Sequence, residues 1–266
     1  MSVAIGAACT ACGACIVTCP ERALAAAPRR PAVDATRCTD CLACVEVCPV
    51  DAIDPDQPGL HPPEVHPIEV ESYRILASRV DLSAWAEPAR AVVARMIHAS
   101  ADESWATSAR VGTGAVDAAV EALGAGAPVV CDANMVVAGV PSLPQARCLL
   151  GQVGGVPPGS TRSAAAIALA ARLYPAGAVW VIGNAPTALG AVIDLWEASL
   201  LDPAAVIGLP VGYVGAAAAK DRLWDSALRR LSITNAGDRG GSAVAAAALN
   251  ALARLAAGRD SPRDPP

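Results

Sequence analysis

From residue 68 onward, the chain alternates long stretches of helical periodicity with short continuous runs of apolar, largely β-branched residues. Each short run leads into Gly, Pro, Asp or Asn, a pattern that predicts buried strands at residues 128–132, 178–183, 205–208 and 231–234. The longer stretches predict helices at about residues 71–80, 87–99, 114–124, 162–173, 186–200, 214–229 and 242–257. Strands that alternate with helices indicate an α/β fold with a mainly parallel sheet and flanking helices.

Residues 1–57 follow a different pattern, which cysteine dominates. Eight of the ten cysteines form two copies of Cys-x2-Cys-x2-Cys-x3-Cys-Pro, and Cys38 repeats Cys9 at an offset of 29 residues. In this spacing, three thiolates of one loop bind three corners of a [4Fe-4S] cubane, and the fourth cysteine serves the other cluster. The predicted ligands are Cys9, Cys12, Cys15 and Cys48 for one cluster, and Cys38, Cys41, Cys44 and Cys19 for the other.

Zinc binding and disulfide formation are the alternatives for these cysteines. Structural zinc sites usually take two separated Cys pairs without a third Cys at this spacing. A disulfide scaffold is disfavoured because the chain shows no export signal and a reducing cytoplasm keeps thiols free. The segment resembles bacterial two-cluster ferredoxins, which implies a small α+β domain over residues 1–57 that carries single electrons and has a redox partner protein.

A proline-rich stretch follows this domain. Residues 55–67 contain five prolines without helical or strand periodicity, and we expect an extended linker at residues 58–67. His61 and His66 lie inside it without a ligand partner at metal-binding spacing, so we interpret both as solvated. The large domain then extends over residues 68–257, and residues 258–266 are predicted to form a disordered tail.

The net charge and the distribution of apolar residues exclude several classes of function. With a net charge of -5, the chain is neither a general nucleic-acid binder nor a ligand of anionic membranes, so any anion site must be built locally. The longest uncharged run, residues 173–193, is interrupted by Pro and Gly, and no membrane span is predicted. The N-terminus lacks the basic and apolar segments of a signal peptide, so we expect a cytoplasmic protein.

Polar loops lie between the predicted strands and the helices that follow them. Carboxyl ends of parallel strands meet at one edge of a sheet, where helix N-termini offer free N–H groups and the positive end of the helix dipole. We therefore predict a pocket for a polyanion there, with Arg162 and Arg239 suited to carboxylates. The other candidates are Thr161, Ser163, Asn184, Thr187, Gly212, Lys220, Gly240, Gly241 and Ser242. Ordinary helix capping accounts for any one of these loops equally well, and no nucleotide-binding motif is present.

The large domain resembles the precorrin-8X methylmutase family of cobalamin biosynthesis. His98 lies at the end of an apolar helix, where composition alone favours a cap or a core residue, but the matching motifs change its interpretation. They appear in family order: Ile68-Glu-x-Glu-Ser72-Tyr73, Arg95-Met-Ile-His98, Gly126-Ala-Pro-x-x-Cys131-Asp132-Ala-x-Met135-Val136, Thr161-Arg162-Ser163-Ala-Ala, Ile182-Gly-Asn-Ala-Pro-Thr187-Ala-Leu189, Gly208-Leu-Pro-Val-Gly212-x-Val214-Gly215-Ala216 and Arg239-Gly-Gly-Ser242-Ala.

The resemblance implies a homodimeric α/β isomerase. It moves a methyl group from C11 to C12 of precorrin-8X, or of cobalt-precorrin-8, to give hydrogenobyrinate or cobyrinate, and the shift itself needs no cofactor. The active-site histidine of the family corresponds to His98, which would act as a general acid. Ser72 and Arg162 correspond to substrate-contacting positions of the family, and Arg95, in the motif of His98, is also predicted to bind the substrate. The carboxylates of a corrin precursor suit the predicted polyanion pocket.

Three family motifs are altered in this chain. Ala99-Ser100-Ala101 replaces Ala-Cys-Gly, Val140-Pro-Ser-Leu-Pro144 lacks the family's arginine, and Ala218-Ala219-Lys220 replaces Glu-Ser-Lys. These changes leave a second interpretation open, in which the chain is a corrinoid-binding electron-transfer protein without mutase turnover. Cys131 and Cys148 lie in apolar surroundings, and we expect them to be unreactive core thiols.

Overall fold

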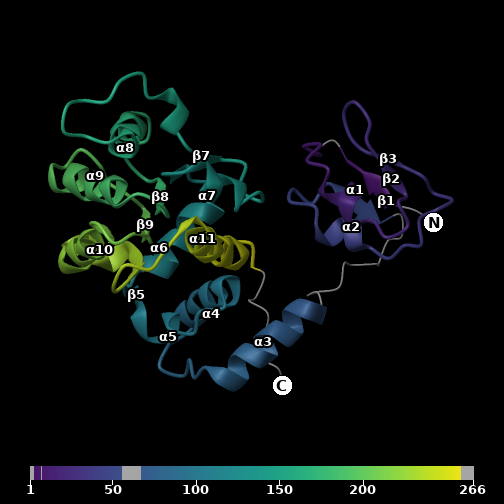
Figure 1. Cartoon of the computed structure of the whole chain (residues 1–266), viewed down its shortest axis with the longest axis horizontal. Coiled ribbons are helices and arrows are strands. Elements are labelled where there is room, and N and C mark those ends of the chain that lie inside the picture. Colours follow the sequence, from purple (N-terminus) through teal and green to yellow (C-terminus); the bar gives the residue numbers. More distant parts are fainter. Residues whose placement is uncertain (1–2, 7, 56–66, 259–266) are drawn as a thin grey trace. The chain divides into compact units, whose positions relative to one another are not determined.

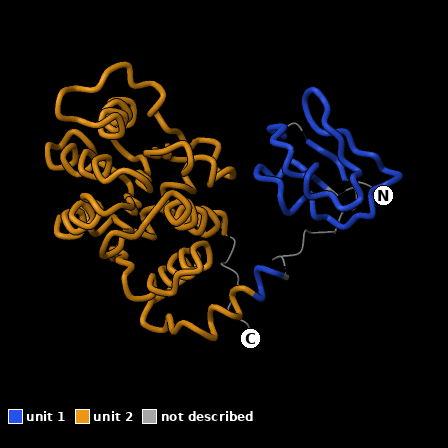
Figure 2. The backbone as a smooth tube through the Cα atoms, viewed as in Figure 1, with its two compact units in different colours: residues 1–71 blue, residues 72–266 orange. Residues whose placement is uncertain are grey.

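The computed structural model describes residues 3–6, 8–55 and 67–258, which belong to two compact units, residues 1–71 and 72–266 (Figure 2). The predicted linker, with His61 and His66, lies outside the described residues except for Pro67, and so does the predicted tail after Gly258. None of the helices in the described part of the chain is both long and apolar enough to cross a membrane.

Over the described residues up to Pro55, the first unit contains two short antiparallel ladders and two short helices (Figure 1). The ladders pair β1 (Val3–Ile5) with β4 (Ile53–Pro55), and β2 (Leu24–Ala25) with β3 (Ala32–Val33). The helices are α1 (Ala14–Thr18) and α2 (Ala43–Glu46). Each helix starts one residue before the third cysteine of its motif, so the two halves of the repeat have the same local structure. The expected small α+β domain is confirmed.

The sequence repeat is also a repeat of backbone conformation. Positive φ angles occur at Ala11, Gly13 and Arg22 of the first copy and at Asp40, Leu42 and Asp51 of the second. Every pair is separated by the same 29 residues as Cys9 and Cys38. Left-handed backbone is unfavourable for residues with a Cβ, so its recurrence at non-glycine positions of both copies shows how strongly this loop geometry is required.

A six-stranded sheet forms the centre of the second unit. Its strands lie in the order β5-β10-β9-β8-β6-β7, and all neighbours are parallel except β5 and β10. The strands are β5 (Ala109–Val111), β6 (Val129–Cys131), β7 (Ala146–Arg147), β8 (Val179–Ile182), β9 (Ala205–Gly208) and β10 (Ser232–Asn235). The predicted mainly parallel sheet is confirmed. The sequence did not predict β5 and β7, because two or three residues are too few to show a periodicity.

Helices cover both faces of this sheet. One side holds α4 (Ala89–Ser100), α6 (Ala115–Gly124), α7 (Asn134–Ala138) and α11 (Ser242–Ala256), and the other holds α8 (Arg162–Leu173), α9 (Pro186–Glu197) and α10 (Ala216–Asp225). The chain reaches α4 through α3 (Pro67–Arg79), and α5 (Trp105–Ser108) follows α4. The helix predicted at 214–229 is wrong at its end: Ser226 leaves the helical conformation, caps Leu228 N–H and starts a 3-10 turn at Ala227–Leu231.

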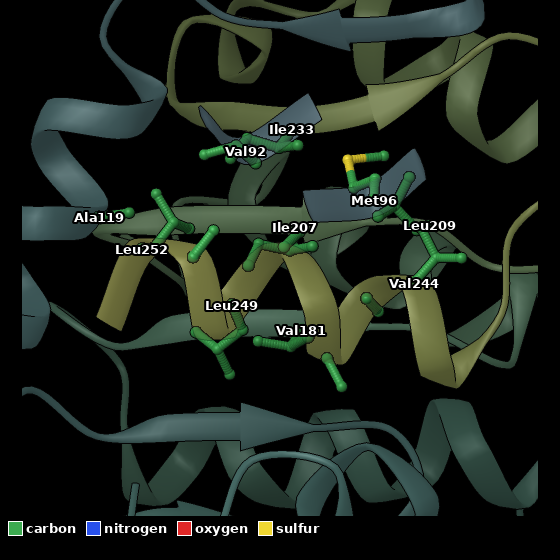
Figure 3. Close-up of a cluster of buried hydrophobic side chains, with 14 of the residues drawn as sticks. Val92, Met96, Ala119, Val181, Ile207, Leu209, Ile233, Val244, Leu249 and Leu252 are labelled. Atoms are coloured by element: carbon green, nitrogen blue, oxygen red, sulfur yellow. The ribbon is translucent and has the colours of Figure 1, made fainter. Parts of the chain in front are cut away.

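The hydrophobic core has two layers because strand residues point alternately to the two faces. Val181 and Ile207 pack against α11, and Figure 3 shows them beside Val244, Leu249 and Leu252 of that helix. Their strand neighbours, such as Trp180, pack against α8 and α9. The many alanines of α11 let it approach the sheet and α4 closely.

The strand order reverses between β6 and β8. From β6 the chain moves outward to β7 and then returns to the other side of β6 with β8, after which β9 and β10 follow in order. The helices after β6 and β8 cover opposite faces, since α7 packs in the α11 layer and α9 in the other layer. Such a switch point opens a crevice at the carboxyl ends of the two strands, where ligands of α/β proteins bind.

Candidate functional site

The loops at the carboxyl edge of the sheet contact one another. The hydroxyl oxygens of Thr161 and Thr187 lie 2.7 Å apart, which joins the start of α8 to the start of α9. A Cβ at Gly183 would lie 2.8 Å from the Cβ of Ala245 and 2.9 Å from the Cα of Ser242, so only glycine lets this loop pack on the first turn of α11. Thus three of the four predicted loops form one continuous surface.

The fourth loop, between β9 and α10, packs on the segment before α11. Gly241 N–H donates to the carbonyl of Leu209 at 2.9 Å, and Gly212 N–H donates to the carbonyl of Asp238 at 3.1 Å. A side chain at Gly240 would collide with the carbonyl oxygens of Leu209 and Pro210. These contacts explain the consecutive glycines of the motif by packing, so neither glycine needs a role in ligand binding.

The predicted polyanion residues differ in their accessibility. Thr161, Arg162, Asn184 and Thr187 are exposed, Ser163, Gly212, Gly240 and Gly241 are partly exposed, and Ser242 is buried. Thr161 also caps α8, since its hydroxyl accepts the Ala164 N–H at 3.2 Å, so the capping role holds for this residue. The helices α8, α9, α10 and α11 begin at this edge, and their positive dipole ends favour negatively charged groups.

Lys220 requires a correction. Its side chain is fully buried, and its Nζ donates to Asn235 Oδ1 at 3.0 Å and to the carbonyl of Arg239 at 2.5 Å. Burial lowers the pKa of this ammonium group to about 8. The side chain therefore fixes the Arg239–Gly241 loop from inside the protein, and the predicted contact between Lys220 and a substrate does not fit this position.

Arg239 connects the carboxyl edge to the end of α4. Its guanidinium donates to the carboxylate of Asp102 and, at 2.8 Å, to the hydroxyl of Ser104. Hydrogen bonds from Ser104 and Arg239 hold the pKa of Asp102 below its usual value. The carboxylate predicted as a partner of Arg239 is thus supplied by the protein itself, and Asp102 lies four residues after His98.

His98 is held by two consecutive residues of α3. The Ser72 hydroxyl lies 2.9 Å from Nδ1 of His98, and the Tyr73 ring stacks on the imidazole with centroids 4.8 Å apart and planes 4° apart. The imidazole is half-buried, and the same helix α4 buries Val92 and Met96 in the core. The ring is therefore fixed at its edge and its face, while Nε2 is the nitrogen not engaged by Ser72.

The structure changes the interpretation of this helix pair. Ser72, predicted as a substrate contact, lies against His98, and Arg95 lies half-buried one turn earlier on α4. Tyr73 was not among the functional residues predicted from the sequence. The only available signal was its position beside Ser72 in the motif, since the 26 residues between Ser72 and His98 give no spacing rule for their contact.

In the first unit, one predicted set of cluster ligands surrounds a common cavity. Cys19, Cys38, Cys41 and Cys44 all line it, together with apolar residues such as Leu24. Burial, and then the nearby thiols of Cys41, Cys38 and Cys19, raise the pKa of Cys44 to about 11. The fourth cysteine of the first motif thus joins three of the second, which is the exchange that the spacing predicts.

The other set shows the same features in part. Burial and the thiols of Cys12 and Cys9 raise the pKa of Cys15. Ala52 N–H donates to Cys48 Sγ at 3.2 Å, and Ala23 N–H donates to the equivalent Cys19 Sγ at 3.3 Å. Among the described residues, no three His, Cys, Asp or Glu side chains converge to bind a single metal ion. The donors present, thiols with N–H groups directed at sulfur, fit iron–sulfur clusters.

Of the two remaining cysteines, only Cys131 lies in the core. It is buried in β6, and burial raises the pKa of its thiol to about 12. Cys148 is only partly buried, so it is not the core residue that the sequence predicted, although burial also raises the pKa of its thiol. Both thiols are therefore protonated near neutral pH, which disfavours reactivity.

Comparison with known protein families identifies two segments. Residues 67–255 match the family described as precorrin-8X methylmutase, and residues 8–52 match a 4Fe-4S dicluster domain. A precorrin-8X methylmutase of Sinorhizobium sp. is 39% identical over 197 residues, which cover 69% of this chain and 91% of that protein. A cobalt-precorrin-8 methylmutase of Methanothermobacter thermautotrophicus is 40% identical over 179 residues, which cover 66% of this chain and 84% of that protein.

Solved structures agree with these matches. The crystal structure of a precorrin-8X methylmutase from Thermus thermophilus aligns with a TM-score of 0.64 and 35% sequence identity, and covers 72% of this chain and 96% of that one. A second structure, of a precorrin-8X methylmutase related protein, aligns with a TM-score of 0.59 and 32% identity, covering 69% of this chain and 99% of that one. The similarity extends over the α/β domain.

Proposed function

This chain belongs to the precorrin-8X methylmutase family, and on that basis we propose that it catalyses the migration of a methyl group from C11 to C12 of precorrin-8X or cobalt-precorrin-8. The enzyme is an isomerase of cobalamin biosynthesis that carries a 4Fe-4S ferredoxin module at its N-terminus. The observation that carries the proposal is the family match over residues 67–255, and the pairing of His98 with Ser72 supports it.

His98 performs the acid–base part of this mechanism. As a general acid His98 acts in its imidazolium form: Nδ1–H donates to the Ser72 hydroxyl oxygen, and the Nε2 proton can pass to the macrocycle, which leaves a neutral imidazole. Protonation eases the change in conjugation as the C11 bond to the methyl carbon breaks and the C12 bond forms. The proton then returns to His98, because substrate and product are isomers. Tyr73 keeps the imidazole plane fixed during this exchange.

The carboxyl edge of the sheet binds the periphery of the substrate. The exposed side chains of Thr161, Arg162, Asn184 and Thr187, with Ser163 and Arg95, bind carboxylates of the corrin ring, assisted by the positive dipole ends of the helices that begin at this edge. Holding a rigid macrocycle at several points places the migrating carbon near His98 and removes much of the entropic barrier.

The ferredoxin module has a separate task. Cys9, Cys12, Cys15 and Cys48 hold one [4Fe-4S] cluster, and Cys38, Cys41, Cys44 and Cys19 hold the other. The clusters supply one-electron transfer, whereas an isomerisation consumes no electrons. The module therefore serves a neighbouring reductive step or the corrin-bound cobalt ion, receives electrons from a redox partner protein, and gains effective concentration from its tether.

The remaining features of the proposal concern organisation. We assign residues 1–57 to the ferredoxin-like domain, 58–67 to the linker, 68–257 to the methylmutase domain and 258–266 to a tail. The enzyme acts in the cytoplasm, where its thiols stay reduced, and works as a homodimer.

A spectroscopic assay tests the function. Anaerobically reconstituted protein is mixed with precorrin-8X or cobalt-precorrin-8, with and without dithionite, and the visible spectrum is followed. The proposal expects conversion to hydrogenobyrinate or cobyrinate at the same rate in both samples. Binding with cluster oxidation but without isomerisation would show instead that the chain is a corrinoid-binding electron-transfer protein.

A further inference from the structure

A buried carboxylate lies at the switch point of the sheet. Asp132 directly follows β6 and is 2% exposed. Its Oδ1 accepts the Gly183 N–H at 2.9 Å, and its Oδ2 accepts the N–H groups of Asn184 at 2.9 Å and Ala185 at 2.7 Å. One side chain from the end of β6 thus binds three successive amides at the end of β8, across the point where the strand order reverses.

These three amides belong to the loop that leads into α9. The loop presents Asn184 and Thr187 to solvent, and Thr187 is paired with Thr161 at the start of α8. Gly183 itself packs on the first turn of α11. The position of the loop therefore decides where two proposed substrate contacts lie and how three helix N-termini are arranged.

We infer that Asp132 is a positioning residue for corrinoid binding, because its carboxylate holds the Gly183–Ala185 backbone in the conformation that presents Asn184 and Thr187 to the substrate. This inference rests on the proposed function. Asp132 itself, at 2% exposure, does not reach the substrate.

The contacts require an acceptor at both carboxylate oxygens. An amide side chain has the same shape, but one of its two oxygens is replaced by an NH2 group that would face N–H donors. An uncompensated buried donor is costly, so the Asp132→Asn variant should release part of the loop. Burial raises the pKa of this carboxyl, and the three N–H donors oppose the rise.

The loop binds substrate and His98 performs the chemistry, and this division predicts how the Asp132→Asn variant changes KM and kcat. The loop binds the periphery of the macrocycle in both the ground state and the transition state, whereas His98 on α4 acts on the reacting carbons. Loss of uniform binding raises KM and leaves kcat unchanged. For hydrogen bonds to a charged group, the expected rise in KM for precorrin-8X is about 10- to 100-fold.

The experiment compares wild type, Asp132→Asn and a matched control in the full-length reconstituted protein. The control is Ser232→Ala, at the start of β10 and therefore at the end of this strand away from the carboxyl edge of the sheet. It removes the 2.8 Å hydrogen bond that the fully buried Ser232 hydroxyl donates to the Leu228 carbonyl. KM, kcat, the Kd of hydrogenobyrinate and the thermal midpoint are measured for each. We expect weaker binding in Asp132→Asn at nearly unchanged kcat, and unchanged binding in Ser232→Ala even where its midpoint falls.

A second measurement needs no variant. Hydrogen exchange of the wild-type protein should show strong protection of the Gly183, Asn184 and Ala185 amides although Asn184 is exposed. Unprotected amides, or an Asp132→Asn variant with wild-type KM and Kd, would overturn the inference. Wild type that neither binds nor converts the substrate would instead refute the proposed function, and the protection of the amides would still be observed.

Discussion

Different interactions stabilise the interior of each of the two units. Among the described residues of the first unit, the buried apolar cluster consists of seven residues, and two of them are the proposed cluster ligands Cys15 and Cys44. In the second unit, buried side chains line both faces of a six-stranded sheet. A domain of this small size buries a small core, and such domains commonly gain stability from metals or cross-links. We therefore expect the first unit to depend on its clusters and the second on hydrophobic burial.

The sites of the two units also differ in how far apart their residues lie in the sequence. In the first unit, three proposed ligands of each cluster come from one short loop and only the fourth from the other copy of the motif, so most of each ligand set is local in sequence. The site of the second unit joins Ser72 to His98, Asp102 to Arg239, and Thr161 to Thr187. Such a site forms only when the whole sheet and its helices are folded.

Removal of the clusters should produce the largest difference between the two units. Extraction of iron with a chelator and an oxidant should unfold the first unit completely and leave the second folded, because metal binding and folding are coupled only in the first. Limited proteolysis with mass spectrometry, followed by a turnover assay, checks this. We expect cleavage within residues 8–55 and unchanged conversion of precorrin-8X; loss of the methyl shift would show that the units depend on each other.

Replacement of His98 should have the next largest effect. In His98→Ala, kcat should fall by about 10²- to 10⁴-fold, since general acid catalysis contributes that much. Binding of hydrogenobyrinate and the absorbance of the clusters should stay as in wild type. Single-turnover kinetics and equilibrium titration measure both quantities. Turnover at the wild-type rate would remove His98 from the mechanism.

Lys220 should make the stability of the second unit depend on pH. Burial lowers its pKa to about 8 from 10.5, so between these values the unfolded chain binds more protons than the folded one. The free energy of unfolding should then rise with pH across this window, by about 3 kcal/mol relative to Lys220→Met.

Urea unfolding of both proteins at several pH values measures this difference, and comparison within the pair cancels the titration of other groups. Arg222→Met on the same helix is the control, because the exposed Arg222 pairs with Asp194 and Glu197 and keeps its charge throughout the window. A difference between wild type and Lys220→Met that does not change with pH would contradict the prediction.

The smallest effect is expected for Ser72. Ser72→Ala removes one hydrogen bond to His98, and kcat should fall about fivefold at unchanged KM, in line with about 1 kcal/mol for such a bond. Ser78→Ala is the matched control, because Ser78 lies on the same helix and its hydroxyl donates to the Ile75 carbonyl instead. A change in KM alone would indicate that Ser72 contacts the substrate, as its family position implies.

Much of the fold could be predicted from the sequence, because periodicity and cysteine spacing are local signals. The helix at 162–173 and the strand at 205–208 agree with the structure residue for residue. The short strands β5 and β7 depend on pairing partners in space and left no local signal, whereas the break at Ser226 has a local cause, the capping of Leu228 N–H by the Ser226 hydroxyl. The resemblance to a family identified His98 and Ser72, but not the contact between them.

By itself, the sequence determined the division into a cysteine module and an α/β domain and the family, and it predicted the two ligand sets. The tertiary structure alone decided the orientation of side chains: that Lys220 points inward, that Tyr73 stacks on His98, and that Asp132 reaches the Gly183 loop. The physical reason is that ligand spacing and hydrophobic periodicity act over a few residues. The direction of a buried polar group is instead set by partners far away in the chain, which supply the hydrogen bonds that burial requires.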